Sequence, residues 1–392
     1  MTSHKKHRIL IVFGTRPEAL KLAPVILEAK KNKAFETYVC LTAQHREMVD
    51  QVLKLFKIKP DFDLNLMVKN QTLGELTQKL FPKIQKVFQQ LRPDGLIVQG
   101  DTTTAFAVAL QAFYERIPTF HIEAGLRSHN KYQPFPEEIN RVLVSHVADY
   151  NFAPTEEARQ NLLNEGILSQ KISVTGNTVV DALNLVRPLI NGRIIPGLEN
   201  LPINKKVVLI TAHRRESFGK PLQSICQAIR DLVKVYPDVE IVYPVHLNPR
   251  VQNTVFKELK GQRGIRLIAP LNYDEFLSLM NRSYLILTDS GGIQEEAPSF
   301  GKPVLVMREK SERPDGIRLG VAKLVGTSKE IIFREASRLI KDSIAYQGMV
   351  KKKNPYGDGK ASKRIIAEIF KLLSKNRTAS SKSPSSKLVY SQ

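Results

Sequence analysis

Cysteine is scarce in this chain of 392 residues, which contains only Cys40 and Cys226. The two lie far apart, outside any CxxC pair and without histidines at the spacing of zinc ligands. The sequence therefore indicates neither a disulfide framework nor a zinc site. It fits a protein of a reducing compartment.

Long hydrophobic runs are also missing. The basic N-terminus leads into a short apolar stretch at residues 9–14, which is too brief for the core of a signal peptide. No run approaches the roughly 18 residues that a membrane-spanning helix needs. We therefore expect a soluble, cytoplasmic protein without a membrane partner.

Acidic residues are outnumbered: 59 Lys and Arg face 38 Asp and Glu, which gives a formal net charge of +21. Such a field attracts polyanions and also a diphosphate substrate, although a solvated lysine-rich surface is the simpler explanation. No signature of DNA or RNA binding accompanies the charge, so we expect no nucleic-acid partner. Part of the excess lies in residues 375–392, whose Ser- and Lys-rich composition predicts a disordered basic tail.

Short apolar runs alternate with amphipathic stretches throughout the chain, which predicts α/β structure with parallel sheets covered on both faces. The length suggests two domains. The predicted strands are residues 8–13, 37–41, 95–98, 119–122 and 150–153, then 207–211, 240–243, 266–268, 284–288 and 303–306. Helices are predicted at residues 18–31, 71–91, 103–114 and 360–374, among others.

These patterns predict two Rossmann-like, doubly wound domains facing a cleft. The first spans residues 1–180 and the second 181–358, followed by a helix at 359–374 that packs back on the first domain and by the tail at 375–392. Proline and glycine interrupt residues 184–204, which makes this stretch the best candidate for the interdomain connection.

Polar clusters follow the predicted strands of the first half. The run GTRPEALK after the first strand places Arg16 and Lys21 near a helix start, where an anion is favoured. Asp101 lies in GDTTT after the strand at 95–98, and Glu123 lies in HIEAGLR after the strand at 119–122. Glu137 opens PEEINR. Each acid can also be read as a helix cap or a first-turn acid.

Two further clusters follow strands of the second half. His213, in AHRRES, stands beside two arginines that disfavour its imidazolium form, so it can serve as a neutral donor or base. In DSGGIQEE, Ser290, Gly291 and Gly292 expose backbone N–H groups at a helix start, which indicates a phosphate cradle. Glu296 lies about one turn further on, within reach of ribose hydroxyls. Arg313 adds a cation downstream.

No GxGxxG motif follows the first strand, and the chain shows no redox motif and no metal cage, so we expect no cofactor. The polar residues fit the binding of a nucleotide-type substrate that carries a diphosphate. A diphosphate-bearing substrate would be held by the second domain, and its reacting sugar would be presented to the acids of the first.

The order of these motifs carries a family resemblance. The strings FGTRPEALK, TAQHREMVDQVL, GDTTT, HIEAGLRS, PFPEEINR, TGNTVVDAL, TAHRRES, YPVHLNP, LTDSGGIQEEAPSFGKPVL, ERPDG and NPYGDG span residues 8–373. They resemble those of the bacterial non-hydrolysing UDP-N-acetylglucosamine (UDP-GlcNAc) 2-epimerases.

The resemblance implies a glycosyltransferase-B-like fold, a homodimer, and no metal or redox cofactor. It implies reversible epimerisation of UDP-GlcNAc at C2 to UDP-N-acetylmannosamine (UDP-ManNAc). UDP would be eliminated and would add back to an enzyme-bound 2-acetamidoglucal.

Motif by motif, the resemblance also implies residue roles. The catalytic residues would be Asp101, Glu123, Glu137 and His213. The nucleotide contacts would be Arg16, Lys21, Ser290, Gly291, Gly292, Glu296 and Arg313, with Phe276 beside the uracil. Some members bind a second UDP-GlcNAc as an activator; the candidate residues for such a site here are Gln44, His45, Arg46 and His246, although Asn70 stands where certain regulated members carry Arg.

Three other functions compete with this prediction. A hydrolysing 2-epimerase would release free ManNAc, whereas the strings PEEINR and HRRES favour the non-hydrolysing type. A glycosyltransferase of the same fold would need an acceptor. A non-catalytic polyanion-binding protein would show no turnover.

Overall fold

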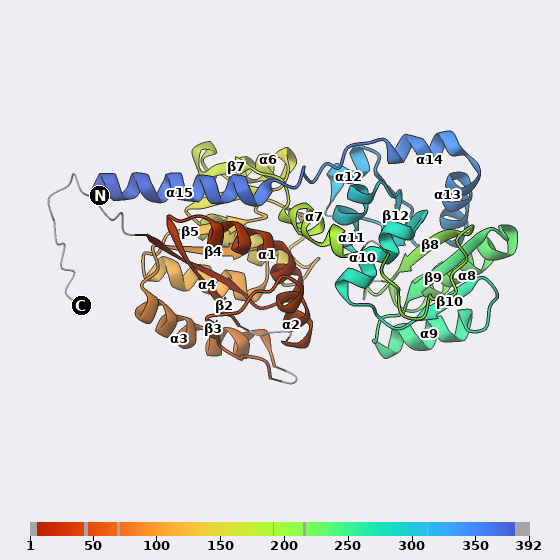
Figure 1. Cartoon of the computed structure of the whole chain (residues 1–392), viewed down its shortest axis with the longest axis horizontal. Helices are drawn as coiled ribbons and strands as arrows, with labels where there is room; N and C mark the ends of the chain where they lie inside the picture. The colour runs from red at the N-terminus through yellow and green to blue at the C-terminus, as the bar shows by residue number, and fades with distance from the viewer. Residues whose placement is uncertain are drawn as a thin grey trace. The chain divides into compact units, whose positions relative to one another are not determined.

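The computed structural model describes residues 6–42, 46–68, 71–190, 192–214, 217–311 and 313–380 (Figure 1). These residues form two compact α/β units. Unit 1 falls within Met1–Gly125, His129–Thr178 and Lys360–Gln392, and unit 2 comprises Leu126–Ser128 and Val179–Gly359. Each unit is built around its own sheet, and the described strands all pair in parallel.

In unit 1 the described strands form a seven-stranded sheet in the order β3-β2-β1-β4-β5-β6-β7. The strands are β1 His7–Phe13, β2 Phe35–Leu41, β3 Phe62–Asp63, β4 Gly95–Gln99, β5 Thr119–Ile122, β6 Tyr150–Ala153 and β7 Ile172–Val174. The helices are α1 Arg16–Lys31, α2 Arg46–Leu55, α3 Leu73–Leu91, α4 Thr103–Tyr114, α5 Glu137–Val147, α6 Glu156–Asn164 and α15 Ala361–Ser380. A short 3-10 helix spans Ser169–Lys171.

In unit 2 the described strands form a six-stranded sheet in the order β10-β9-β8-β11-β12-β13. The strands are β8 Lys206–Thr211, β9 Val239–Pro244, β10 Ile265–Ile268, β11 Leu285–Thr288, β12 Val304–Val306 and β13 Ala322–Leu324. The helices are α8 Lys220–Val235, α9 Pro249–Leu259, α10 Tyr273–Arg282, α11 Gly291–Glu296, α12 Pro314–Arg318, α13 Lys329–Lys341 and α14 Ser343–Val350. A 3-10 helix at Ala297–Phe300 follows α11 directly.

Both sheets reverse their strand order once, between β1 and β4 in unit 1 and between β8 and β11 in unit 2. At such a switch point the loops that follow the two strands diverge to opposite faces of the sheet. A crevice therefore opens at the carboxyl ends of the strands, where ligands bind in doubly wound folds. The fold thus predicts one candidate site region in each unit.

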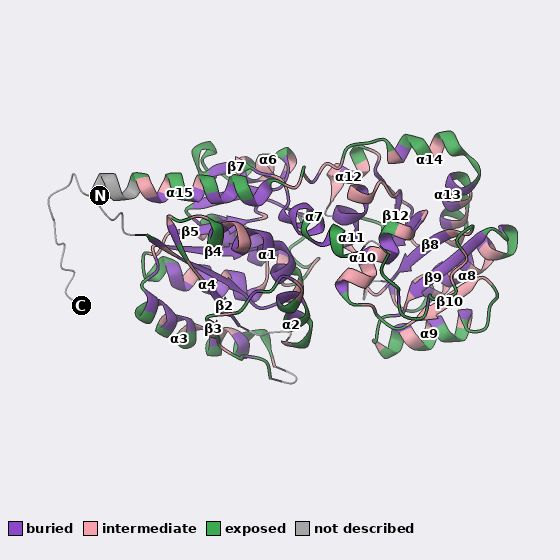
Figure 2. Cartoon of the chain, in the orientation of Figure 1, coloured by how far each residue is buried: buried purple, intermediate pink, exposed green. Residues whose placement is uncertain are grey.

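Burial explains why these segments form strands and helices. Strand β1 is buried along nearly its whole length, as expected of a central parallel strand with helices on both faces. Helix α3 buries Leu76, Leu80, Ile84, Val87 and Leu91, which recur at helical spacing. Figure 2 shows the same division, with buried strands inside each unit and exposed residues on the outer faces of the helices.

Every strand predicted from the sequence is present within one or two residues at each end. Three strands were not predicted: β3, β7 and β13, each of which lies at an edge of its sheet. Each is only two or three residues long and partly exposed. Such strands lack the continuous apolar run by which the buried strands were recognised.

The predicted connection at residues 184–204 is wrong. The units divide between Thr178 and Val179, at the start of helix α7 (Thr178–Ile190), so the whole stretch belongs to unit 2. Pro188 lies in the last turn of α7. A proline there removes one backbone N–H and favours the end of the helix, so the interrupted pattern marks a helix end rather than a linker.

Helix α15 returns the chain to unit 1 and packs against α1. It buries Ile365 and Ile369, and the Phe370 ring meets the Phe35 ring edge-on with centroids 6.1 Å apart. The helix continues to Ser380, six residues beyond the predicted end at Ser374, because backbone hydrogen bonds do not require apolar side chains. Residues 381–392, the rest of the predicted tail, lie outside the described residues.

Cys40 and Cys226 are both free and buried, and burial raises the pKa of the Cys226 thiol to about 12. No helix in the described part of the chain is long and apolar enough to cross a membrane.

Candidate functional site

In unit 1, a buried carboxylate joins the two loops at the switch point. Glu18, in the first turn of α1, accepts hydrogen bonds from the backbone N–H groups of Gly14 (3.0 Å) and Thr15 (2.8 Å) and from the Thr15 hydroxyl (2.8 Å). Its other oxygen accepts from the hydroxyl of Thr102, in the loop after β4, at 2.7 Å. Burial raises the pKa of Glu18, and these hydrogen bonds oppose that shift. Glu18 thus ties the loop after β1 to the loop that carries Asp101.

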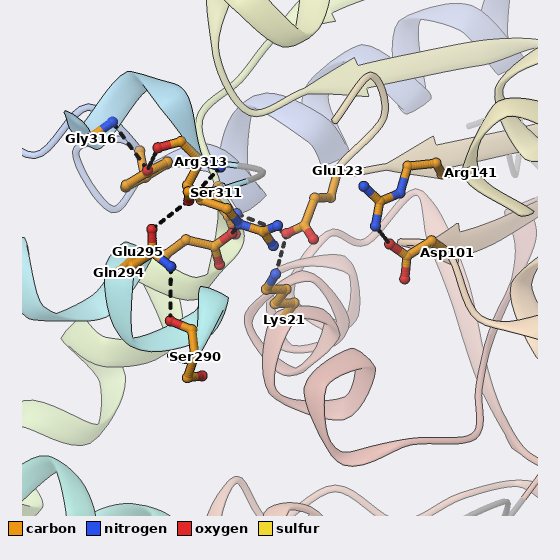
Figure 3. A network of polar contacts seen from close by, with 12 residues as sticks. Lys21, Asp101, Glu123, Arg141, Ser290, Gln294, Glu295, Ser311, Arg313 and Gly316 are labelled. Atoms are coloured by element: carbon orange, nitrogen blue, oxygen red, sulfur yellow. Dashed lines mark hydrogen bonds and ion pairs between the residues drawn. The ribbon is translucent and has the colours of Figure 1, made fainter. Parts of the chain in front are cut away.

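Glu123, directly after β5, forms a buried ion pair. The Lys21 Nζ lies 2.5 Å from the Glu123 Oε2 (Figure 3), and each side chain is only 9% exposed. Asn177 donates a hydrogen bond to the same oxygen at 2.8 Å. Glu123 has a φ of 63°, in the left-handed region that costs a non-glycine residue on the order of 1–3 kcal/mol. The ion pair favours the charged form of both groups, so Glu123 is held as a carboxylate, the form that can accept a proton.

Asp101, directly after β4, shares an arginine with a second acid. Arg141 of α5 contacts Asp101 Oδ2, and its other terminal nitrogen lies 3.2 Å from Glu138 Oε2 (Figure 3 draws the first contact). Arg141 and Glu138 are buried, whereas 28% of the Asp101 side chain is exposed. The Asn140 amide donates to the Asp101 backbone carbonyl at 3.0 Å. Asp101 is therefore fixed in place with part of its carboxylate open to solvent.

The two acids that open helix α5 have different environments. Glu138 is buried with Arg141 and also accepts a hydrogen bond from the His129 backbone N–H at 2.9 Å. Glu137, the first residue of α5, is only half-buried. Glu138 is therefore held in the interior of unit 1, and Glu137 is the more exposed of the two acids.

In unit 2, Asp289 joins the loops after β8 and β11. It follows β11 directly and is fully buried. Its Oδ2 accepts hydrogen bonds from the backbone N–H groups of His213 and Arg214, both at 2.8 Å, and lies 3.4 Å from the Ser217 hydroxyl. Its Oδ1 lies 3.4 Å from His213 Nδ1. The loop that carries His213 is thus folded around this carboxylate.

The His213 ring is stacked on that of His246, from the loop after β9, with centroids 5.3 Å apart and planes 11° from parallel. Burial is the main cause that lowers the pKa of His213. The negative charge of Asp289 raises this pKa, and the positive charges of His246 and Arg214 lower it further. The sequence predicted a disfavoured imidazolium from the two neighbouring arginines, but the larger cause is desolvation. His246, which the family resemblance suggested as an allosteric residue, lies against His213.

Ser290, Gly291 and Gly292 lie at the start of α11, with Ser290 as its N-cap. Arg313 is held beside this turn: its Nε donates to the buried Glu295 carboxylate at 2.8 Å, and a β-carbon built on Gly291 would lie 3.3 Å from the Arg313 Cζ. A chain of hydrogen bonds from Arg313 N through Ser311 Oγ to Gln294 Oε1 fixes the segment further (Figure 3). Backbone donors and a cation therefore converge at one strand end.

The remaining nucleotide candidates of unit 2 lie around the same helix start. Glu296 is buried and accepts a hydrogen bond from the Tyr273 hydroxyl at 3.0 Å. Phe276 lies three residues further along α10 than Tyr273 and is half-buried. Tyr273 thus links α10, which carries Phe276, to α11.

The remaining residues predicted in unit 1 lie at the starts of α1 and α2 or outside the described residues. Arg16 is the first residue of α1 and is half-buried. Arg46, at the start of α2, donates to Asp50 at 3.0 Å and contacts Asp63. Gln44, His45 and Asn70 lie outside the described residues.

Among the described residues, no group of three or more His, Cys, Asp and Glu side chains is arranged to hold a metal ion. Unit 1 supplies ionisable carboxylates, and unit 2 supplies an imidazole and backbone N–H donors. Carboxylates and an imidazole can transfer protons, and backbone N–H donors can bind an anion.

The residues predicted from the sequence do not include four that the structure brings to these sites: Glu18, Glu138, Arg141 and Asp289. Two of them had signals in the sequence. Thr15-Arg16-Pro17-Glu18 has the T-x-x-E spacing of a capping box, and Asp289 stands between a buried strand and the glycine pair. Arg141 and Glu138 had no such signal, because both read as ordinary residues of an amphipathic helix.

Fold and site together define a two-domain α/β protein of the glycosyltransferase-B-like class, with acids in one unit and a glycine-rich helix start in the other. A family model described as UDP-N-acetylglucosamine 2-epimerase matches residues 27–370. The chain is 50% identical to the UDP-N-acetylglucosamine 2-epimerase of Escherichia coli K12 over 365 residues, which cover 92% of this chain and 97% of that protein. It is 49% identical to the Bacillus subtilis 168 enzyme of the same name over 366 residues, or 93% and 96% of the two chains.

Solved structures agree with these sequence comparisons. The UDP-GlcNAc 2-epimerase from Neisseria meningitidis, bound to UDP-GlcNAc, superposes with a TM-score of 0.88 at 48% identity and covers 93% of this chain and 100% of that one. S. aureus MnaA in complex with UDP superposes with a TM-score of 0.87 at 47% identity, covering 94% and 97%. The chain belongs to the UDP-N-acetylglucosamine 2-epimerase family. The fold class and family predicted from the sequence are thereby confirmed.

The Arg141 contacts generate a prediction about stability. Replacing Arg141 with Met removes a buried cation that contacts both the buried Glu138 carboxylate and Asp101, and should lower the free energy of unfolding by about 3–5 kcal/mol. The exposed pair Arg159–Glu156 provides the control, because Arg159→Met should cost about 0–1 kcal/mol. Urea unfolding of both variants measures the difference, and equal losses would contradict a structural role for the buried pair.

Proposed function

We propose that this protein interconverts UDP-GlcNAc and UDP-ManNAc by inverting C2 of the sugar, in the cytoplasm. Membership of the family and the UDP-GlcNAc bound in the Neisseria meningitidis relative support the substrate. The observation that carries the chemistry is the Glu123 carboxylate, held ionised by Lys21 and Asn177 at the carboxyl end of β5. A charged, oriented base is what removal of a carbon-bound proton needs.

The proposed reaction proceeds by elimination and re-addition. A base removes the proton from C2, the C1–O bond breaks with its electron pair leaving on UDP, and a 2-acetamidoglucal remains bound. UDP then adds back at C1 while an acid protonates C2 on the opposite face. Inversion therefore needs acid–base groups on both faces of the ring, and departure of UDP needs stabilisation of its charge.

Unit 1 supplies the acid–base groups in this proposal: Asp101, Glu123 and Glu137. Asp101 and Glu123 follow the neighbouring strands β4 and β5, so both lie at the same edge of the sheet. Glu137 is the less buried of the two acids that open α5, which suits a group that contacts a ligand. His213 of unit 2 is the fourth catalytic group, and its lowered pKa favours the neutral ring.

Glu123→Gln keeps the shape of the side chain but removes the base, so turnover should fall by about 10²–10⁴. In D2O, the unaltered protein should place deuterium at C2 of UDP-ManNAc and, after reversal, of UDP-GlcNAc, which proton NMR detects. Glu36→Gln, at an exposed position of β2 in the same unit, is the matched control and should leave turnover unchanged.

Two results would contradict this mechanism. Epimerisation without solvent deuterium at C2 would exclude proton abstraction. Free ManNAc as the accumulating product would show instead a hydrolysing 2-epimerase.

UDP would be bound by unit 2, with the diphosphate at the start of α11. The backbone N–H groups of Ser290, Gly291 and Gly292 supply donors there, and Arg313 supplies a charge that Glu295 orients. Glu296 is placed to accept from ribose hydroxyls and Phe276 to pack by the uracil. Arg16 and Lys21 of unit 1 are proposed to contribute further positive charge.

Gly292 allows this placement to be tested with little disturbance of the protein. A β-carbon at Gly292 meets only the Ser290 hydroxyl, at 3.9 Å, so alanine fits the unliganded protein. We expect Gly292→Ala to weaken UDP binding at least tenfold, about 1.4 kcal/mol, because the methyl group blocks approach of the phosphate. Gly348→Ala in α14, also in open space, is the control. Titration calorimetry that finds equal UDP affinity in both variants would discard the placement.

We further propose a homodimer formed through unit 1. Helices α4 and α5 pack against each other and expose large apolar side chains: Phe113, Tyr114, Ile139 and Leu143. Apolar side chains gathered on one surface are typical of protein interfaces, and a twofold axis would pair the same surface on both copies.

A charge within this surface should separate the dimer. We expect Leu143→Glu to yield monomers in analytical ultracentrifugation, because a twofold contact would bury two like carboxylates. Leu168→Glu, at an exposed leucine of unit 1 that is not part of α4 or α5, should leave the mass unchanged. A monomeric unaltered protein, or two variants with the same mass, would refute the proposed interface.

A further inference from the structure

A buried oxygen next to His213 is not used by the mechanism proposed above. Asp289 is fully buried, and its two carboxylate oxygens have different surroundings. Oδ2 accepts the backbone N–H groups of His213 and Arg214. Oδ1 is buried, accepts no hydrogen bond from the described residues, and lies 3.4 Å from His213 Nδ1. A buried carboxylate oxygen without a donor is costly, and the nearest candidate donor is the imidazole.

The geometry points to Asp289 as the positioning residue of His213: it holds the ring in the Nδ1–H tautomer, so that Nε2 is the nitrogen that exchanges protons with the substrate. This inference rests on the proposed function for the role of His213. The role of Asp289 itself follows from the contacts of the described residues.

The surroundings of the ring support this assignment. The His213 backbone is anchored by the same carboxylate through Oδ2, so a small ring rotation brings Nδ1–H onto Oδ1 without moving the loop. On the other side, the stacked His246 ring limits rotation. His246 Nδ1 itself accepts the Asn248 backbone N–H at 3.1 Å, so it offers no competing acceptor for His213. A carboxylate that orients a histidine in this way serves catalysis without touching the substrate.

The substitution Asp289→Asn separates this role from a role in folding. The amide oxygen can take the place of Oδ2 and accept both backbone N–H groups, which preserves the loop. The amide NH2 then donates toward His213 Nδ1, so Nδ1 must act as the acceptor and cannot carry the proton. The proton should move to Nε2, so the variant should fold but present the wrong tautomer.

The experiment is ¹⁵N NMR of the full chain with labelled histidine rings at about pH 8, where the lowered pKa leaves His213 neutral. The His213 signals are assigned by their loss in His213→Asn. We expect Nδ1–H in the unaltered protein and Nε2–H in Asp289→Asn, with kcat reduced about 10²–10⁴-fold and KM little changed. Ser217→Ala is the control: it removes a hydroxyl that lies beside Asp289 Oδ2 and leaves Oδ1 and His213 unchanged. This variant should retain the Nδ1–H tautomer.

An Nε2–H ring in the unaltered protein would overturn the inference, and so would the same tautomer in both proteins. If Asp289→Asn does not fold, the spectrum of the unaltered protein still decides the tautomer. A protein that fails to turn over UDP-GlcNAc but shows the Nδ1–H ring would refute the proposed function and leave the role of Asp289 intact.

Discussion

A buried carboxylate that spans the switch point is the interaction on which each site depends. In unit 1 Glu18 accepts hydrogen bonds from the loops after β1 and β4, and in unit 2 Asp289, which follows β11, accepts hydrogen bonds from the loop after β8. Adjacent parallel strands bring these loops close together, but their helices then leave on opposite faces of the sheet. Charge-assisted hydrogen bonds in a low dielectric are strong enough to hold the diverging segments in one arrangement.

The positions of the acidic side chains in unit 1 are fixed by the need to pair buried charges. Burying a charge is costly unless it is paired, so Glu123 requires Lys21 and Glu138 requires Arg141. Lys21 of α1 reaches Glu123 after β5, and Arg141, which shares α5 with Glu138, also reaches Asp101 after β4, so these contacts lock helix against strand end. These ion pairs hold the acids in fixed positions, as the proposed acid–base catalysis requires. In unit 2 the donors are mainly backbone N–H groups, whose positions follow from the turn into α11.

Particular elements show how far the sequence predicts this structure. The buried strands were predictable because a central parallel strand is a continuous apolar run, whereas β3, β7 and β13 are short, partly exposed edges without that signal. Polar residues after such strands could be assigned to one edge of each sheet, because parallel strands end there together. The deeper burial of Glu138 than of Glu137 could not be predicted from the sequence, because it depends on the contacts of Glu138 with Arg141 and with the His129 backbone.

The sequence by itself determined the two parallel α/β domains, the strand ends at which polar residues gather, and, through its ordered motifs, the family. These are local properties, since periodicity and turn chemistry act over a few residues. Only the tertiary structure decided which groups pair. Arg141 reaches Asp101 across 40 residues, and the His213 backbone reaches Asp289 across 76. Such pairs depend on strand order and on burial, which raises the cost of any charge left alone, and neither can be read from the neighbours of a residue along the chain.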